Sequence, residues 1–327
     1  MKVVPEVTCI GELMVDFVSI KAGVSLAESS GFFKFAGGAP ANVAVGLARL
    51  GTKAAFVGKV GNDSFGKFLG GQLRREGVDV RGLCYDKRYK TRLAFVSLTK
   101  SGERDFEFWE QRPADEQLEN SDVDVDRIAA SKIVHISSFS LLSNPARSTV
   151  LRAAIDVGQR GCAVSFDPNL RLSLWKSPRV ARMQAQQVVK LSTILRLNEE
   201  EARFLTGKQK LQTAAEKLLS TGPKIVVVTL GGDGCFFQTA NHSGFVKGFT
   251  VKEVDTTGCG DGFLAGFLHG IARTTKKLKE LSAKDLQSIC QYANAVGALT
   301  ATRRGGISAL PNSHETGKFL KKRTRIR

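Results

Sequence analysis

The sequence has few of the features that mark secreted, membrane or metal-binding proteins. Its six cysteines are scattered, with no CxxC pair and no spacing typical of metal ligands, so they indicate free thiols in a reducing compartment. No apolar run approaches the roughly 20 residues that a membrane-spanning helix requires. The N-terminus has no charged segment followed by a long apolar stretch, which a secretory signal requires. We therefore expect a cytoplasmic protein without a membrane partner.

The charge is unbalanced, with 48 Lys and Arg against 31 Asp and Glu in 327 residues. The apolar fraction of 42% and the mean hydropathy of −0.09 are typical of one large α/β domain or of two domains. A net charge of +17 indicates an anionic ligand, a nucleic-acid partner or a basic surface. Six of the last ten residues are basic and none is acidic, so much of the excess lies in the C-terminal segment.

Short apolar segments alternate with segments of helical spacing along most of the chain. The patterns predict strands at residues 7–10, 54–57, 133–137, 162–166, 194–197 and 225–230. They predict helices at residues 41–50, 65–76, 145–159, 178–191, 199–219, 258–274 and 283–302. This alternation is typical of right-handed βαβ units, which form a parallel sheet with helices on both faces.

Two segments, at about residues 12–35 and 81–111, interrupt the alternation. Both contain period-two patterns, such as LAFVSL at 93–98, which are typical of antiparallel hairpins. The two insertions could form a small sheet that covers the main domain as a lid. Alternatively, they could extend the edge of the main sheet.

The motif DTTGCGDG at residues 255–262, followed by an apolar helix, is the strongest chemical signal. Its glycines allow a ligand to approach the backbone, and the helix start presents free N–H groups to an anion. A carboxylate at Asp261 would repel a bound phosphate, but it could take a proton from an attacking hydroxyl group. Considered alone, this motif fits a phosphoryl-transfer site and an ordinary helix cap about equally well.

Two other glycine-rich turns have both a functional and a structural interpretation. GGAPAN at residues 37–42 leads into a helix, where Asn42 could reach a polyol or could simply be part of a helix start. TLGGDG at residues 229–234 follows a buried strand, at the end where ligands bind in open α/β sheets. It could equally be a turn between two strands.

In combination, these segments resemble the ribokinase-like (PfkB-type) carbohydrate kinases, and among them the fructokinases most closely. The resemblance covers about residues 7–311 and rests on residues 37–42, 167–171, 198–201, 229–234 and 255–267, in the family's order. It implies an α/β three-layer sandwich with a mostly parallel central sheet and a small β lid. The implied core is 1–11, 36–80 and 112–316, the lid is 12–35 and 81–111, and a basic tail is 317–327.

The resemblance also implies a role for each matching residue. Asp261 would be the catalytic base, and the backbone of Gly258, Cys259 and Gly260 would form the anion hole. Asp16, Gly38, Asn42 and Arg171 match sugar-binding positions. Thr229, Gly231, Gly234 and Asn294 match the ATP side, and Asn198 and Glu201 match the positions that organise Mg²⁺ and phosphate. The backbone of Asp255 and Thr257 matches a monovalent-cation site, where K⁺ would bind. We expect MgATP and a sugar as ligands, and a homodimer formed through the lid.

Two departures from the family pattern stand out. Cys259 replaces the usual alanine, and a thiol at a helix N-terminus is expected to be reactive. Glu110 stands where fructokinases usually carry a basic residue, which Arg112 could replace from a shifted position. Fructose remains the leading substrate, because Ala39-Pro40 follows the paired glycines here, whereas 2-keto-3-deoxygluconate kinases tend to carry an Asp at that point.

Two alternatives stay open at this point. A keto-deoxygluconate kinase would need an extra arginine for the substrate's carboxylate, and Arg92 and Arg112 are the candidates. A non-catalytic scaffold in a nucleic-acid assembly would account for the positive charge. Such a scaffold would not need Asp261 or the glycines around it, all of which are present, so a nucleic-acid partner is not expected.

Overall fold

A large sheet runs through the centre of the protein in the computed structural model, which describes residues 4–21, 23–98, 104–109 and 111–324. Within those residues, nine strands pair in the order β13-β12-β11-β10-β9-β8-β1-β4-β5. The strands are β1 Val7–Ile10, β4 Ala54–Gly61, β5 Asp79–Asp86, β8 Ile133–Ser137, β9 Ala163–Asp167, β10 Ile194–Asn198, β11 Ile225–Thr229, β12 Gly234–Gln238 and β13 Ser243–Lys247. All neighbouring pairs are parallel except β11 with β12 and β12 with β13.

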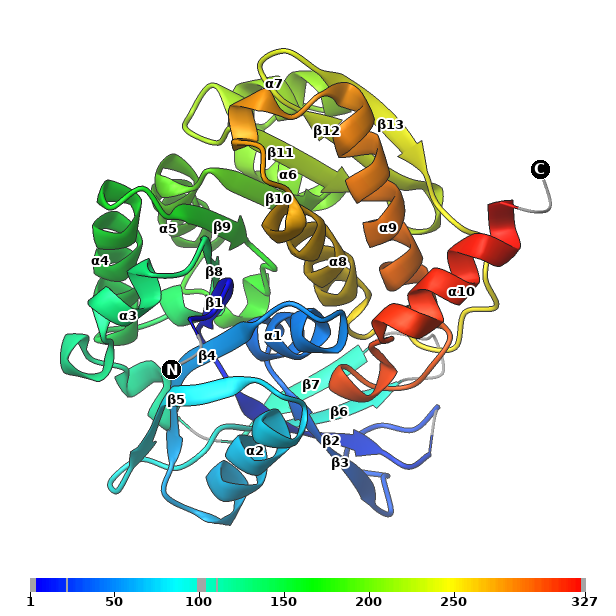
Figure 1. The fold of residues 1–327 in the computed structure, drawn as a ribbon. Helices are drawn as coiled ribbons and strands as arrows, with labels where there is room; N and C mark the ends of the chain where they lie inside the picture. The colour runs from blue at the N-terminus through cyan, green and yellow to red at the C-terminus, as the bar shows by residue number, and fades with distance from the viewer. Residues whose placement is uncertain (1–3, 22, 99–103, 110, 325–327) are drawn as a thin grey trace.

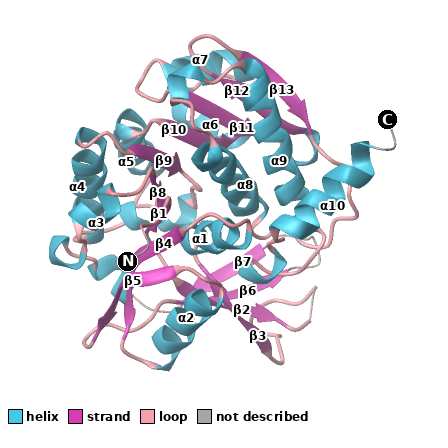
Figure 2. Ribbon diagram, viewed as in Figure 1, coloured by secondary structure: helices cyan, strands magenta, loops and turns pink. Residues whose placement is uncertain are grey.

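Helices cover both faces of this sheet (Figures 1 and 2). The helices are α1 Ala39–Arg49, α2 Ser64–Arg75, α3 Val125–Ala129, α4 Ala146–Gln159, α5 Pro178–Leu191, α6 Glu199–Thr206, α7 Leu211–Leu219, α8 Cys259–Arg273, α9 Ala283–Ala301 and α10 Ser313–Thr324. Alternate residues of each strand face opposite layers. Ile225 and Val227 of β11 belong to the apolar cluster that includes residues of α1, α2, α8 and α9, whereas Val226 and Val228 belong to the cluster that includes residues of α3 to α7. The expected three-layer α/β architecture is thereby confirmed.

A second, smaller sheet lies beside the first. Its strands are β2 Met14–Ser19, β3 Phe32–Gly37, β6 Leu93–Leu98 and β7 Arg104–Phe108, in the order β3-β2-β6-β7. Both alternatives for the second insertion are therefore realised. Residues 79–86 pair with β4 at the edge of the large sheet, because β5 completes the βαβ unit that α2 begins. Residues 93–98 and 104–108 contribute to the small sheet, which we call the lid.

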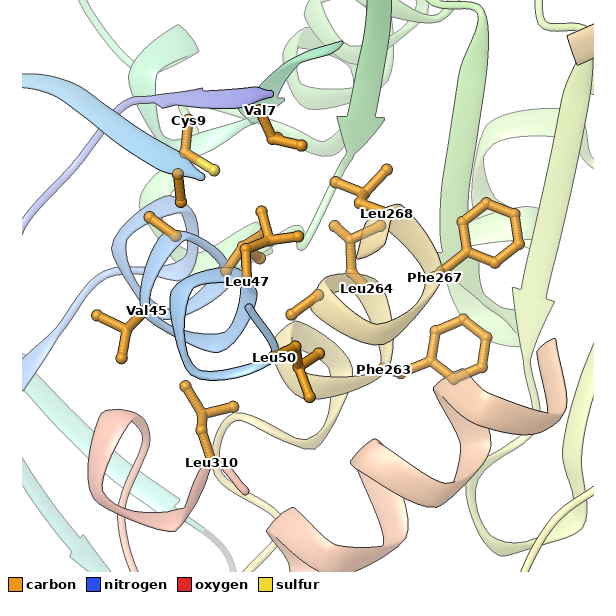
Figure 3. Packing of buried hydrophobic residues seen from close by; sticks show 14 of the residues in the cluster. Val7, Cys9, Val45, Leu47, Leu50, Phe263, Leu264, Phe267, Leu268 and Leu310 are labelled. Carbon is orange, nitrogen blue, oxygen red and sulfur yellow. The ribbon is translucent and has the colours of Figure 1, made fainter. Parts of the chain in front are cut away.

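Close packing of α1 against α8 brings the N-termini of the two helices together. Leu47 and Leu50 of α1 share one apolar cluster with Leu264 and Leu268 of α8 (Figure 3). A Cβ atom at Gly46 would lie only 2.6 Å from the Cβ of Ala265, so the glycine lets the two helices approach closely. This packing sets the positions of the glycine-rich turns that precede both helices.

The predicted strands and helices correspond closely to observed ones, with one clear error, and the elements α3, α10, β12 and β13 were not predicted. The helix expected over residues 199–219 is two helices, because Gly207 ends α6 in the left-handed conformation at φ 70°. The basic segment that begins at residue 317 continues α10 as far as Thr324. Within the described residues, no helix combines the length and the apolar character needed to cross a membrane.

Candidate active site

Two cavities lie at the carboxyl ends of the parallel strands, next to the first turn of α8. The smaller, of about 150 Å³, is lined by Asp16, Asn42, Arg171 and Asp261 among others. The larger, of about 430 Å³, is lined by Thr229, Gly234, Asn294 and other residues, with Cys259 and Gly260 in its wall. Consecutive residues at the start of α8 therefore face different cavities.

Asp261 lies in the first turn of α8 and is only 8% exposed. The side chain of Asn42, from the first turn of α1, donates a hydrogen bond of 2.7 Å to its Oδ2 atom. Burial raises the pKa of Asp261 to about 6, although the Asn42 hydrogen bond and the charges of Arg196 and Arg171 act in the opposite direction. The group is thus largely ionised at neutral pH but retains appreciable basicity.

The start of α8 presents backbone donors toward the cavities. Gly258 is the N-cap with φ 76°, a conformation that glycine adopts without strain. The N–H of Cys259 donates to the carbonyl oxygen of Thr256 at 3.2 Å. Helix geometry gives the N–H groups of Gly260 and Asp261 no acceptor four residues back, so they are the donors best placed for an anion.

The four residues predicted for the sugar side all line the smaller cavity. Asp16 comes from β2 of the lid, and Gly38 is the N-cap of α1. Arg171 follows β9, and its Nη1 atom donates to the Oδ1 atom of Asn169 at 2.8 Å. Burial and the neighbouring charge of Asp261 raise the pKa of Asp16 to about 7. One wall of the cavity therefore belongs to the lid and the others to the core.

The four residues predicted for the ATP side likewise line one cavity, the larger one. Gly231 and Gly234 border a short turn between β11 and β12. The amide of Asn294 in α9 donates to the carbonyl oxygens of Val246 at 3.0 Å and Lys247 at 3.3 Å. Asn294 thus fixes the end of β13, where that strand borders the cavity.

Asn198 and Glu201 are near the cavities but line neither of them. They form a capping box at the start of α6, in which the Glu201 Oε2 atom accepts from the N–H of Asn198 at 2.9 Å. The Glu201 Oε1 atom accepts from the N–H of Leu170 at 2.7 Å. Within the described residues, no group of three or more His, Cys, Asp or Glu side chains could hold a metal ion. A metal here would need ligands from a substrate or from water.

Asp255 and Thr257 are the residues predicted for a monovalent cation, and the carboxylate of Asp255 stabilises the loop that contains them. Asp255 accepts from the N–H and hydroxyl of Thr257 at 2.9 and 2.7 Å, and its other oxygen accepts from the N–H of Gly305 at 2.9 Å. The carboxylate is therefore already hydrogen-bonded, and a cation at this loop would bind backbone carbonyl groups.

Arg196 is a site residue that sequence analysis missed. It lies in buried β10, and its guanidinium group donates to Asp167 at 2.8 Å and to the hydroxyl of Thr229 at 2.7 Å. A Cβ atom at Gly260 would lie 2.9 Å from this guanidinium group, which explains the glycine. The one signal in the sequence was a charged residue within an otherwise apolar strand.

Glu12 was missed as well, although it lies only two residues after the end of the apolar strand β1. Its side chain is 3% exposed and lines the smaller cavity.

Glu110, which departs from the family pattern, lies outside the described residues. The guanidinium group of Arg112 is 5.9 Å from the ring centre of Tyr89, and Arg112 lines neither cavity.

Comparisons with known proteins identify the family of this chain. A family profile described as "pfkB family carbohydrate kinase" matches residues 4–313. "Probable fructokinase-2" of Arabidopsis thaliana is 42% identical over 316 residues, which cover 96% of this chain and 95% of that protein.

Solved structures give the same result. A double mutant of fructokinase from Vibrio cholerae O395, bound to fructose, ADP and potassium ion, superposes with a TM-score of 0.86 at 33% identity and covers 98% of this chain and 100% of its own. A ribokinase II homologue from Escherichia coli, in complex with ATP and Mg²⁺, has a TM-score of 0.87 at 30% identity, with 98% and 100% covered. The chain therefore belongs to the pfkB family of carbohydrate kinases.

Proposed function

We propose that this carbohydrate kinase transfers the γ-phosphate of ATP to the primary hydroxyl group of D-fructose, which gives fructose 6-phosphate. The observation that carries the proposal is the position of Asp261. Its carboxylate faces the smaller cavity, while the next residues toward the N-terminus, Gly260 and Cys259, border the larger one. A sugar in the first and ATP in the second would meet at the start of α8.

In this mechanism, Asp261 acts as the general base. The Oδ2 atom is held by Asn42, so we assign the proton of the attacking hydroxyl group to Oδ1. As that proton leaves, the sugar oxygen forms a bond to the γ-phosphorus atom and the bond to the β,γ-bridging oxygen breaks, which releases ADP. The positive end of the α8 dipole, with the N–H groups of Gly260 and Asp261, stabilises the negative charge on the transferred group.

The residues present fit a magnesium ion that ATP carries with it. Mg²⁺ keeps several waters and takes only one or two protein carboxylates. Glu201 is held by two backbone N–H groups, and each of its oxygens retains a lone pair. With Asn198, it would hold the hydrated ion, whose charge would neutralise the phosphates. The fructokinase from Vibrio cholerae is described as bound to a potassium ion, which supports K⁺ as a ligand of this chain as well. We place it at the backbone of Asp255 and Thr257.

Fructose fits the smaller cavity better than a sugar acid does. Asp16 and Asp261 are acidic side chains that line the cavity of about 150 Å³, whereas burial raises the pKa of the third, Glu12, to about 8 and keeps it mainly neutral. Among the residues that the structure describes, Arg171 is the one basic side chain that lines it. A substrate carboxylate would meet net repulsion there, whereas a neutral polyol would find hydrogen-bond partners.

The arginine that a keto-deoxygluconate kinase would need is already engaged. Arg92 is 4% exposed, and its guanidinium group pairs with Asp115 at 3.0 Å and Glu116 at 2.6 Å. That group also lies 4.8 Å from the ring centre of Phe139. The second candidate, Arg112, is over the ring of Tyr89 and outside the cavity lining.

The experiment is an ATP-dependent phosphorylation assay over fructose, glucose, ribose, adenosine and 2-keto-3-deoxygluconate. We expect the highest kcat/KM for fructose and product phosphorylated on the primary hydroxyl group. A higher kcat/KM for the keto acid would overturn the substrate assignment. The absence of turnover with every sugar, together with tight and salt-sensitive nucleic-acid binding, would favour the scaffold alternative instead.

A further inference from the structure

Glu12 occupies the junction between the core and the lid. It lies between β1, which belongs to the large sheet, and β2, which is the first strand of the lid. The lid strand β3 returns to the core at Gly38, the N-cap of α1. A Cβ atom at Gly38 would lie 2.5 Å from the carbonyl oxygen of Glu12, so the chain enters and leaves the β2–β3 hairpin of the lid next to this residue.

The side chain of Glu12 connects three elements. Its Oε1 atom accepts a hydrogen bond of 2.9 Å from the N–H of Ala39, the first residue of α1. Its Oε2 atom is 2.9 Å from the hydroxyl oxygen of Ser137, the last residue of β8. The group is 3% exposed, and within the described part of the chain no ion pair neutralises it.

The connection extends to the proposed base in two further steps. The N–H of Asn42 donates to the carbonyl oxygen of Gly38 at 2.9 Å in the first turn of α1. The side chain of Asn42 then donates to Asp261 at 2.7 Å. A change in the position of the α1 N-terminus would therefore move the group that orients Asp261.

We propose that Glu12 is a positioning residue for the sugar, which fixes the junction between lid and core and, through α1, the wall of the sugar cavity. The inference rests on the proposed function, because it takes the smaller cavity as the site where the sugar binds. Glu12 acts through Ala39, Ser137 and Asn42, and it takes no part in proton transfer.

Glu12 fulfils this role as a neutral acid. Burial raises the pKa of Glu12 to about 8. The N–H of Ala39 can only donate, so Oε1 is the acceptor. The ionised group accepts from the hydroxyl group of Ser137, whereas in the neutral acid Oε2 carries the proton and donates to that hydroxyl oxygen. A glutamine would reproduce both interactions, since its carbonyl oxygen accepts from Ala39 and its amide donates to Ser137. An alanine would leave the buried N–H of Ala39 without its partner.

The test compares Glu12→Gln, Glu12→Ala and Thr8→Val in steady-state kinetics. Thr8 is the matched control, because it is a buried polar residue on the adjoining strand β1 whose hydroxyl group bonds to Ser131 at 2.7 Å, outside both cavities. We expect Glu12→Ala to raise KM for fructose at least about tenfold, with KM for ATP within twofold of the wild type. Glu12→Gln should stay within about threefold of the wild type in both.

Two results would overturn the inference. One is a Glu12→Ala variant that loses thermal stability as Thr8→Val does but keeps the wild-type KM for fructose, which would make Glu12 merely structural. The other is a Glu12→Gln variant as impaired as Glu12→Ala. Failure of the proposed function can be distinguished from failure of this inference, because the wild-type protein itself would then not phosphorylate fructose.

Discussion

Asp261 is surrounded by groups that act on its pKa in opposite directions. Burial raises that pKa to about 6, while the hydrogen bond from Asn42 favours the charged form. A general base works only when deprotonated, so we expect kcat/KM to fall about tenfold per pH unit below pH 6 and to level off above pH 7. If Asp16, whose pKa is raised to about 7, must also be ionised to accept sugar hydroxyl groups, the acid limb becomes steeper and the plateau begins at a higher pH.

The Asn42→Ala variant provides a direct check of this assignment. Without the Asn42 hydrogen bond, the ionised form of Asp261 loses a stabilising partner, and the acid limb should move to higher pH. The readout is the pH profile of kcat/KM, with Asn241→Ala in the β12–β13 turn as a control that keeps the wild-type profile. If the acid limb of Asn42→Ala is not shifted, then the limb does not report the ionisation of Asp261.

Cys259 leads to a second prediction at the scale of residues. Its thiol is half-buried at the positive end of α8 and borders the larger cavity, whereas Cys9, Cys162, Cys235 and Cys290 are buried. We expect N-ethylmaleimide to inactivate the protein and saturating ATP to slow the inactivation. Cys259→Ala should resist, and Cys84→Ala should remain sensitive because Cys84 borders neither cavity. Equal inactivation of Cys259→Ala and the wild type would refute the prediction.

The sequence identified the site residues that lie in glycine-rich or contiguous motifs. Asp16, Gly38, Asn42 and Arg171 come from three separate segments, yet all four line one cavity. Glu12 and Arg196 were missed, because a buried charged residue becomes informative only when its partners are known. Those partners are distant in sequence, such as Asp167 for Arg196 and Ser137 for Glu12.

At the scale of elements, Arg196 holds together the carboxyl ends of three adjacent strands. It extends from β10 to Asp167 on β9 and Thr229 on β11, and it is 8% exposed. Removal of the cation leaves a buried carboxylate without its partner, which typically costs about 3–5 kcal/mol. We therefore expect Arg196→Met to lower the free energy of unfolding by about 3 kcal/mol or more.

Arg196→Lys is the matched variant, because it keeps the charge but loses the fork of donors, and its loss of stability should be smaller. Denaturant unfolding of the two variants and the wild type provides the measurement. An Arg196→Met variant as stable as the wild type would show that the pair with Asp167 does not stabilise the sheet.

The elements themselves were largely predictable, and the exceptions have local causes. Strands β1 and β8 and helix α5 have the predicted bounds, because apolar periodicity and capping residues agree there. The division between α6 and α7 was missed, since helical spacing of apolar residues continues past Gly207. The pairing of β5 with the large sheet could not be decided from period-two patterns, which are the same in either sheet.

At the scale of the whole molecule, the lid leaves apolar side chains exposed. Val18 pairs in register with Phe33 of β3 and with Val96 of β6, so the three share one face, and Phe33 is 53% exposed. Asp16, two residues before Val18, is on the same face and lines the sugar cavity. A second copy of the chain would bury this face beside the sugar sites of both copies.

We therefore expect a homodimer in solution that Phe33→Lys converts to monomers. Light scattering coupled to size-exclusion chromatography provides the masses. Met183→Lys is the control, because Met183 on α5 is 50% exposed but lies outside the lid, and it should leave the dimer intact. A wild-type protein that is monomeric at micromolar concentration would refute the prediction.

The net charge of +17 is distributed away from the two cavities. The basic residues of the segments 273–279 and 318–322 line neither of them. Within the sugar cavity, acidic side chains outnumber basic ones. The overall charge can draw anions such as ATP toward the molecule, but it does not describe the chemistry of the sugar site.

The central claim is that Asp261 takes the proton from a sugar hydroxyl group at the start of α8. It is tested most directly by the rate of fructose-dependent ADP formation in the wild type and in Asp261→Asn, with the Kd for ATP measured for both. We expect Asp261→Asn to lose at least about 100-fold in kcat while its Kd for ATP changes little. An Asp261→Asn variant that phosphorylates fructose at the wild-type rate would contradict the account.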